Sequence, residues 1–320
     1  MTGNRGIAAP GCARTRQDNM TGLENKAMHQ TETKKKSFLP HLCVLLAGTL
    51  WGCIGLYNRR LLGAGLSVQT LVLVRNSGGA LVLGLLGALL DRSVFRVRLR
   101  HLPIFLGTGL VSILLFTLCY FSCQQLCSLA VAAVLLYTAP AFVVLLAAIL
   151  WKEKLTKRKL LALLLAFLGC LLVTGLWSGD LQVTAWGAVL GVCSGLFYGL
   201  YSIFGHYALA HYTPGAVTFY TFLFAALGAL VLLRPAEVAA CFASGETALP
   251  ALGLILLGTV APYLLYTRGL AGLESGKAAI LASIEPVVAA LVGVLAFGEP
   301  MDLGIVGGLV CIVASVVILR

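Results

Sequence analysis

The chain has 320 residues, of which 59% are hydrophobic and 11% are charged, whereas soluble domains carry about 45–50% and about 25%. This composition leaves too little polar surface to face water and excludes a soluble globular protein. The formal net charge of +11 comes from basic clusters between apolar stretches, which argues against nucleic acid as a partner.

Residues 1–37 form a polar segment at the N-terminus. The segment is rich in Lys and Arg and has no apolar core of the kind that a secretory signal peptide requires. Such a composition cannot bury enough apolar surface to fold by itself. We therefore expect residues 1–37 to be a disordered tail on the cytoplasmic side.

From residue 40 onward, long apolar runs follow one another with short polar interruptions. A helix needs about 20 apolar residues to cross the ~30 Å hydrocarbon core of a bilayer. Because the runs are continuous rather than alternating, they exclude a β-barrel. The predicted fold is an all-α integral membrane protein with ten transmembrane helices. The predicted spans are residues 40–57, 68–90, 102–124, 128–151, 158–176, 184–206, 215–234, 249–270, 275–297 and 302–319.

The loops between these spans differ in charge. With a cytoplasmic N-terminus, the inner loops hold nine Lys and Arg residues between residues 92 and 159, and the outer loops hold mainly Arg59, Arg60 and Arg234. Cytoplasmic loops of membrane proteins carry an excess of Lys and Arg. The asymmetry predicts a multi-pass protein of the cytoplasmic membrane with both termini in the cytoplasm.

An internal repeat appears at a single offset of 146 residues, without a gap. Its strongest stretch aligns AVAAVLLYTAPAFVVLLAAILWKEK with GKAAILASIEPVVAALVGVLAFGEP. Each half holds five spans, an odd number, so the second half enters the membrane in the opposite orientation. We predict two inverted five-helix repeats, residues 38–178 and 182–320, an arrangement typical of carriers with a midplane substrate site. The offset aligns Trp51 with Phe197, Gly107 with Gly253, Tyr120 with Tyr266, Pro140 with Pro286, and Glu153 with Glu299.

Short motifs in the spans resemble the EamA-type family of the drug/metabolite transporter superfamily over residues 40–319. The resemblance implies a ten-helix inverted-repeat carrier with a central cavity formed largely by spans 1, 3, 4, 6, 8 and 9. Known members of the family move amino acids and other small metabolites. The motifs are Leu50–Trp51–Gly52, Arg75, Thr138–Ala139–Pro140 followed by residues 152–156, Glu285–Pro286, and Gly298–Glu299.

Glu285 lies about ten residues into the ninth predicted span, near the bilayer centre. A carboxylate at this depth costs roughly 2.5–3.5 kcal/mol on insertion scales, so a functional role is the default hypothesis. Glu285 could titrate and couple transport to protons, or attract an ammonium group of the substrate. The structural alternative is that it satisfies backbone groups freed by Pro286.

Arg75 and a set of aromatic residues are the candidate substrate-binding residues. Arg75 could contact an anionic group or form an internal ion pair, although its long side chain could also snorkel to the surface. The aromatic faces and hydroxyls suit amphipathic or aromatic solutes, and interfacial belting or packing is the alternative. The aromatic candidates are Trp51, Tyr120, Tyr137, Tyr198, Tyr201, Tyr263 and Tyr266.

The sequence indicates neither a cofactor nor a metal. Cys119, Cys123 and Cys127 recur at every fourth position, but three cysteines without a fourth ligand make a poor zinc or iron–sulfur site. No P-loop, zinc-protease or nucleophile-elbow motif is present in the sequence. Pro140, Pro262 and Pro286 fall inside spans and predict kinks.

Together these features predict a secondary active transporter of a small organic metabolite, an amino acid or a related compound, driven by proton or substrate gradients. The expected partners are the small-molecule substrate and the lipid bilayer. Because one chain holds both halves, a monomer would suffice, and a dimer stays open. An intramembrane enzyme is the alternative, but it would need catalytic groups clustered at one depth, which Glu285 and the scattered tyrosines do not provide. A channel or a membrane scaffold would not give saturable, counter-substrate-accelerated flux.

Overall fold

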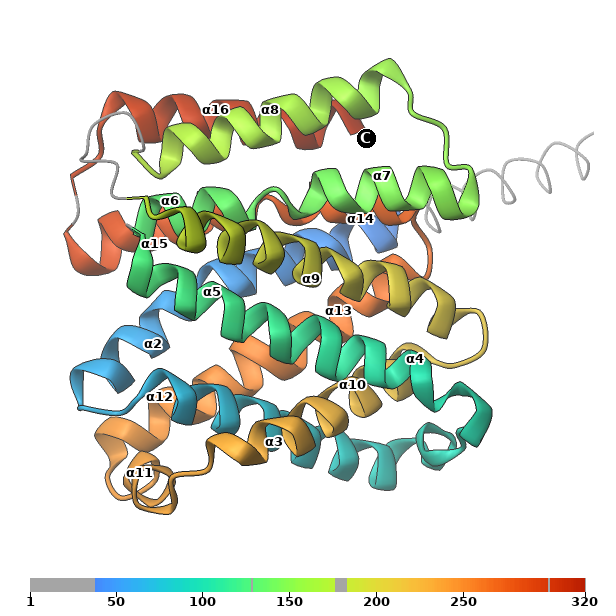
Figure 1. Cartoon of the computed structure of the whole chain (residues 1–320), viewed down its shortest axis with the longest axis vertical. Helices are drawn as coiled ribbons and strands as arrows, with labels where there is room; N and C mark the ends of the chain where they lie inside the picture. Colours follow the sequence, from blue (N-terminus) through green and yellow to red (C-terminus); the bar gives the residue numbers. More distant parts are fainter. Residues whose placement is uncertain (1–37, 128, 176–182, 299, 320) are drawn as a thin grey trace, which may run out of the picture. The chain divides into compact units, whose positions relative to one another are not determined.

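The computed structural model describes residues 38–127, 129–175, 183–298 and 300–319, and these residues form helices and connecting turns (Figure 1). They contain no β-strand, only an isolated bridge between Cys127 and Val183. Residues Pro40–Arg320 make up one compact unit. The predicted disordered tail, residues 1–37, lies outside the described residues.

The helices of the first half run from Phe38 to Val173. The first helix, Phe38–Gly63, contains α2 as its second part, and a π-helical segment, Gly107–Leu114, joins α4 to α5. The bounds are α2 Ile54–Gly63, α3 Val68–Leu90, α4 Leu102–Leu106, α5 Leu115–Leu126, α6 Leu129–Leu136, α7 Ala139–Trp151 and α8 Lys157–Val173, with 3-10 turns at Arg92–Phe95 and Leu99–His101.

The second half follows the same plan from Ala185 to Leu319. A second π-helical segment, Leu256–Val260, joins α12 to α13, and a short helix, α11, lies between two spans. The bounds are α9 Ala185–Leu209, α10 Pro214–Ala229, α11 Pro235–Cys241, α12 Gly245–Ile255, α13 Ala261–Leu270, α14 Ser275–Ala282, α15 Glu285–Phe297 and α16 Leu303–Leu319, with a 3-10 turn at Leu230–Leu232.

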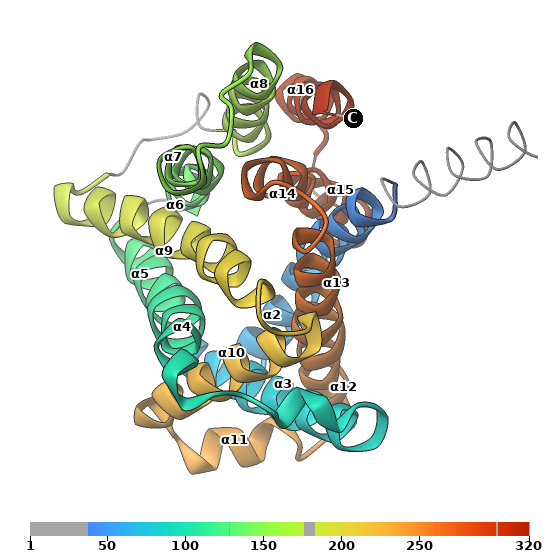
Figure 2. The same cartoon turned by 90° about the vertical axis from the view of Figure 1, so that its right-hand side faces the viewer.

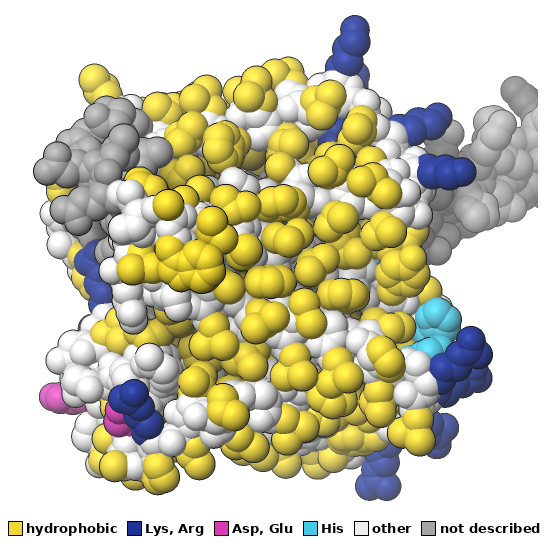
Figure 3. Space-filling view, in the orientation of Figure 1, with side chains coloured by type: hydrophobic (Ala, Val, Ile, Leu, Met, Phe, Trp, Pro, Cys, Tyr) yellow, Lys and Arg dark blue, Asp and Glu magenta, His cyan; other side chains and the backbone are white. Residues whose placement is uncertain are grey.

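Eight helices in the described part of the chain are long and apolar enough to cross a membrane. This confirms the prediction of an all-helical, multi-pass membrane protein. The face seen in Figure 3 is covered mainly by hydrophobic side chains, as a lipid-facing surface requires. The eight helices are Phe38–Gly63, Val68–Leu90, Leu99–Leu126, Val131–Trp151, Ala185–Leu209, Pro214–Leu232, Gly245–Leu270 and Ser275–Phe297.

The predicted count of ten spans depends on α8 and α16. Each has 17 residues, which gives a helix about 26 Å long, slightly shorter than the hydrocarbon core. The two helices pack extensively on each other and lie side by side in both views (Figures 1 and 2).

The helix boundaries show the same 146-residue offset as the sequence repeat. Helices α14, α15 and α16 begin and end 146 residues after α6, α7 and α8. The residues that directly follow α7 and α15 both have a left-handed backbone conformation. They are Lys152, with a φ of 56°, and Gly298, with a φ of 67°. Both π-helical segments lie within the same aligned stretch of the repeat. The two halves therefore share backbone irregularities as well as apolar periodicity.

Glycines allow helices of the two halves to approach closely. A Cβ atom at Gly187, Gly191 or Gly195 of α9 would lie within 3.0 Å of atoms from α5, α6 or the residues that flank them. The sulfur atoms of Cys123 and Cys127 are among these contacts. The four-residue glycine spacing is therefore a packing stripe, and the cysteines that face it have a packing role.

The α8–α16 pair crosses at Gly169 and Gly308. A Cβ on Gly169 would lie 2.9 Å from the Gly308 carbonyl oxygen, and a Cβ on Gly308 would lie 2.7 Å from the Gly169 carbonyl oxygen. Neither helix can tolerate a side chain at this point without moving apart. Close backbone approach at small residues is a principal source of helix association in lipid.

We expect Gly169→Leu to separate α8 from α16 and to lower the thermal stability of the detergent-purified protein, because overpacking typically costs about 1–3 kcal/mol. Gly55→Leu is the matched control, since a Cβ at Gly55 has no atom within 4 Å. A melting temperature that falls equally in both variants would contradict the close crossing.

Outside the spans, Glu237 of α11 holds the start of α3. Its Oε2 accepts hydrogen bonds from the Ser67 backbone N–H at 2.9 Å and from the Thr70 hydroxyl at 2.7 Å, and its Oε1 accepts one from Arg234 at 3.0 Å. These bonds, led by that from the Ser67 hydroxyl, lower the pKa of Glu237 to about 2. An anion at a helix N-terminus is also favoured by the helix dipole.

We expect Glu237→Gln to lower the melting temperature at neutral pH. Because the folded pKa lies below the ordinary value of 4.5, the stabilisation is complete above that value. It is lost as pH falls from about 4.5 toward 2. Melting curves across this window should therefore fall more steeply for the parent protein than for the variant. Parallel curves would contradict the role of the charge.

Candidate functional site

Two broken helices meet at the centre of the protein. The span Val131–Trp151 is interrupted between α6 and α7, and the span Ser275–Phe297 is interrupted between α14 and α15. Pro140 and Pro286 follow the two breaks and lack the N–H that would continue the helix. The predicted kinks at these two prolines are therefore confirmed as helix breaks, and α7 packs against α14.

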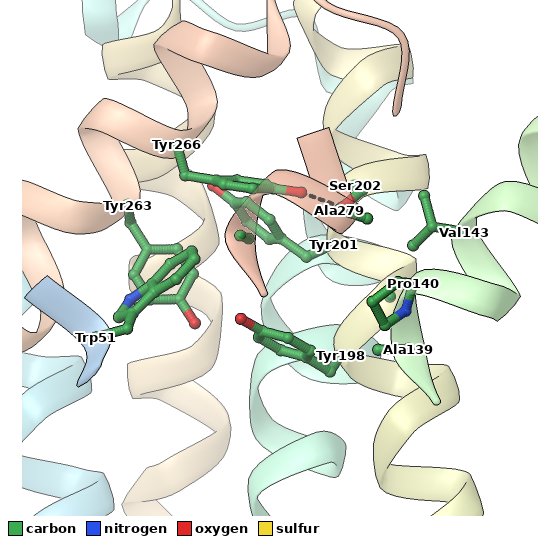
Figure 4. Close-up of a pocket in the computed structure, with 12 residues that line it drawn as sticks. Trp51, Ala139, Pro140, Val143, Tyr198, Tyr201, Ser202, Tyr263, Tyr266 and Ala279 are labelled. Carbon is green, nitrogen blue, oxygen red and sulfur yellow. Dashed lines mark hydrogen bonds between the residues drawn. The ribbon is translucent and has the colours of Figure 1, made fainter. Parts of the chain in front are cut away.

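A small cavity lies beside this junction (Figure 4). Its volume is about 30 Å³, and since one buried water needs about 10–15 Å³, it has room for about two waters. An organic solute would need a wider opening than this conformation provides. The lining residues are Trp51, Ala139, Pro140, Val143, Tyr198, Gly199, Tyr201, Ser202, Tyr263, Tyr266, Ala279 and Ala282.

Five of the predicted aromatic residues come together around the cavity. The Trp51 ring centroid lies 5.0 Å from that of Tyr263 and 5.3 Å from that of Tyr266. Tyr198 faces Trp51 at 6.3 Å, and Tyr201 stands perpendicular to Tyr263 at 5.3 Å. Figure 4 shows these rings, contributed by the first helix, α9 and α13. These five residues, which we call the aromatic cage, therefore come from both halves of the repeat.

Hydroxyl groups of the cage are fixed by neighbouring Ser and Thr side chains. The Tyr201 and Thr267 hydroxyls share a hydrogen bond of 2.6 Å, and the Tyr266 and Ser202 hydroxyls share one of 2.7 Å (Figure 4 draws the second). Thr267 also donates to the Tyr263 carbonyl oxygen at 2.7 Å. These bonds orient the rings and satisfy buried polar groups.

Glu285 lies at the edge of the cage rather than in its wall. It is the first residue of α15, and its Oε2 accepts a long hydrogen bond of 3.5 Å from the Tyr198 hydroxyl. The position at a helix N-terminus favours a negative charge through the helix dipole. Glu285 therefore connects the break in the ninth predicted span to the cavity through Tyr198.

Arg75 of α3 reaches the same region. Its guanidinium interacts electrostatically with Tyr263 and with Glu285. The Arg75 Nε and the Trp51 Nε1 atoms are buried and have no hydrogen-bond partner among the described residues. Two buried donors in this region thus have no acceptor among the described residues.

The other two predicted tyrosines do not line the small cavity, but both interact electrostatically with Glu285 at its edge. Tyr120 packs between Phe116 and Phe121, with ring centroids at 6.3 and 5.9 Å. Tyr137, at the break after α6, lines a separate apolar hollow of about 400 Å³ with Cys170 and Phe167. Contact between either side chain and the substrate stays a prediction.

Sequence reasoning missed the small residues of the cavity wall. Ser202 follows Tyr198 by four positions on the same face of α9, a spacing that could have identified it. Val143 and Ala279 belong to the broken helices and no sequence feature marks them, and Ala139 was marked only as part of the Thr138–Ala139–Pro140 motif, because these residues line the cavity only through the position of the breaks.

The described part of the chain contains no group of three His, Cys, Asp or Glu residues that could hold a metal ion. The site consists of aromatic rings, hydroxyls, one carboxylate and one guanidinium. Such groups bind and orient an organic solute through stacking and hydrogen bonds.

The comparisons with known proteins agree with this architecture. The model of the EamA-like transporter family matches the chain twice, over residues 38–175 and 185–320. An uncharacterized transporter of Archaeoglobus fulgidus is 33% identical over 199 residues, which cover 62% of this chain and 70% of the relative. A second uncharacterized transporter of that organism is 26% identical over 216 residues, covering 67% and 75%.

Two further similarities extend these matches. An uncharacterized protein of Pseudomonas aeruginosa is 34% identical over 196 residues, covering 57% of this chain and 64% of the relative. A crystal structure of a protein with 19% identity superposes with a TM-score of 0.75 over 87% of this chain and 95% of that one, which establishes the likeness of fold. With both halves of its sequence matched by the family model, the chain belongs to the EamA-like transporter family.

Proposed function

We propose that the protein is a secondary active transporter that moves a small organic metabolite, an amino acid or a related compound, across the cytoplasmic membrane by alternating access. The observation that carries the proposal is the caged cavity beside two broken helices, one from each half of the repeat. Carriers built from repeats bind their substrates at such discontinuous helices near the midplane.

The proposed topology has ten spans in two inverted repeats, residues 38–178 and 182–320, with α8 and α16 as the fifth and tenth spans. Lys and Arg support the orientation, since they gather at the edge of the molecule that carries the α7–α8 connection (Figure 3). Both termini then lie in the cytoplasm. A single chain contains both halves, so we propose that a monomer transports.

The groups around the cavity favour a substrate with both an acceptor and an apolar or cationic part. The buried Trp51 Nε1 and Arg75 Nε atoms need an acceptor, which a substrate carboxylate would supply. Aromatic faces of Trp51 and Tyr198 suit an apolar part, and Glu285 suits an ammonium group. Because the cavity has room for about two waters, transport requires the halves to move apart.

Proton coupling is the role that we propose for Glu285. Its carboxylate is placed where it can exchange a proton when the cavity opens, and Arg75 and Tyr198 act on it directly. Ionisable residues inside membrane spans mark proton relays and substrate pathways. The alternative role, anchoring the backbone freed by Pro286, predicts lost folding rather than lost coupling.

The function is tested by flux into vesicles that contain the purified protein. A panel of amino acids and related metabolites should include one whose uptake saturates and accelerates when unlabelled compound is preloaded on the other side. Uptake that never saturates across the panel, or that ignores the preloaded compound, would contradict alternating access and favour a channel.

We expect Glu285→Gln to abolish uptake driven by a pH gradient while exchange of substrate across the membrane continues, since the amide cannot carry a proton. Glu246→Gln, at an exposed acid in the first turn of α12 and so at the very end of its span, is the matched control and should transport like the parent. Equal pH dependence of uptake in both variants would remove Glu285 from coupling.

We expect single cysteines in place of Lys154 and Val183 to react with a membrane-impermeant thiol reagent from opposite sides of the membrane. Lys154 follows α7 and Val183 precedes α9, and both side chains are exposed. The predicted topology places residues 152–159 in the cytoplasm and residues 177–183 outside. Labelling of both positions from one side would overturn this topology.

A further inference from the structure

A polar hollow lies at the end of the molecule that the proposed topology places in the cytoplasm, away from the aromatic cage. It has a volume of about 390 Å³ and is formed by the α3–α4 connection of the first half and the α9–α10 connection of the second half. The lining residues are Ser93, Arg96, Arg98, His101, His211, Tyr212, Thr213 and Ala216.

The lining of this hollow is basic. The Arg96 and Arg98 side chains are exposed, and neither forms a salt bridge among the described residues. The lining contains two His residues and no acidic residue. Asp91 interacts with Arg96 and accepts a hydrogen bond from the Ser93 backbone N–H at 3.0 Å. One carboxylate at the rim leaves the hollow with a net positive charge.

Tyr212 fixes the walls of the hollow relative to each other. Its hydroxyl accepts a hydrogen bond from the Arg98 backbone N–H at 3.1 Å and lies 2.7 Å from His101 Nδ1. The rings of His101 and His211 are 4.7 Å apart between centroids. Figure 3 shows His side chains beside Lys and Arg at the right-hand edge. The arginine and histidine side chains therefore line one hollow with fixed walls and are not simply scattered along a loop.

The excess of Lys and Arg that sets topology does not by itself account for this arrangement. In the first turn of α8, at the same end, Lys159 is paired with Glu153 at 2.9 Å and with Glu274 at 3.0 Å. The repeat also gives the hollow no counterpart, because the positions aligned with Arg96 and Arg98 are Phe242 and Ser244. The basic hollow is thus a feature of one end only.

Apolar side chains beside the hollow place it at the membrane surface. Leu89 and Leu90, at the end of α3, are each 80% exposed, and Leu99, between the two arginines and His101, is 81% exposed. Exposed leucines at the end of a membrane-crossing helix suit contact with lipid, and arginines next to them in the sequence suit the phosphate layer at the membrane surface. Guanidinium groups bind phosphate oxygens in bidentate geometry.

We propose that this hollow binds a phosphate-bearing anion, with Arg96 and Arg98 as its main ligands. The anion is the headgroup of an acidic phospholipid or a free phosphate compound, and the exposed leucines favour the lipid. Basic pockets at the cytoplasmic side of membrane helices hold such headgroups. The site is distinct from the aromatic cage and does not depend on the identity of the transported solute.

The test measures phospholipid bound to the purified full-length chain by native mass spectrometry. Arg96→Gln with Arg98→Gln should weaken binding of phosphatidic acid roughly 30-fold, because each basic residue near the surface contributes about fivefold. The matched control is Lys154→Gln with Lys157→Gln, which removes two exposed charges from the same end but outside the hollow. The control should bind phosphatidic acid like the parent.

Further measurements separate the sources of the anion and the alternatives. Displacement of phosphatidic acid by millimolar inorganic phosphate would assign the site to phosphate itself, and retention against phosphate would assign it to the lipid. Both results support the proposal. Equal losses of phosphatidic acid binding in the two double variants would show that the lipid binds through general surface charge. No loss of binding in either variant would show that the hollow is not a binding site. Either result overturns it, provided that all variants elute as the parent does.

Discussion

Backbone polar groups cannot remain unpaired in lipid, and this constraint determines where the protein can be irregular. Non-helical backbone at membrane depth persists only where protein buries it or where it lines a cavity. The breaks after Leu136 and after Ala282 obey this rule, since both lie at the packed centre beside the cage. Ala139 and Pro140 begin α7 directly after the first break, and Glu285 and Pro286 begin α15 directly after the second. All four residues therefore lie where the protein buries irregular backbone.

Duplication supplies the backbone twice, but the chemistry differs between the copies. The positions aligned with Arg75 and Glu285 are Thr221 and Ala139, neither of which is charged. In the structure, Thr221 bonds only to Thr108 and to the backbone of its own helix. The two charged groups near the cavity, Arg75 and Glu285, therefore come from only one position of each aligned pair. A symmetric scaffold with an asymmetric site can change its accessible side while it keeps one set of substrate contacts.

The sequence predicted eight spans that the structure bears out, the repeat, and five residues of the cage, because hydrophobic runs and a gapless offset can be read directly from the residues. It did not predict the π-helical segments, Gly107–Leu114 and Leu256–Val260, or the helix α11, since these depend on packing between distant segments. A Cβ atom added to Gly107 would lie 3.0 Å from the Phe204 ring, and one added to Gly253 would lie 2.3 Å from the Tyr57 ring. Such paired contacts become visible only when the halves are assembled.

Ion pairs and a hydrogen bond join three helices at the end of the molecule assigned to the cytoplasm. Lys159, 2% exposed, bridges Glu153 and Glu274, and Glu153 also accepts the Ser275 backbone N–H at 3.0 Å. These bonds join α7 and α8 to the start of α14. The position aligned with Lys159 is Ile305, so the opposite end has no equivalent lysine. Because separating the buried Lys159–Glu153 pair would leave an uncompensated charge, this contact favours the packed arrangement of α7, α8 and α14.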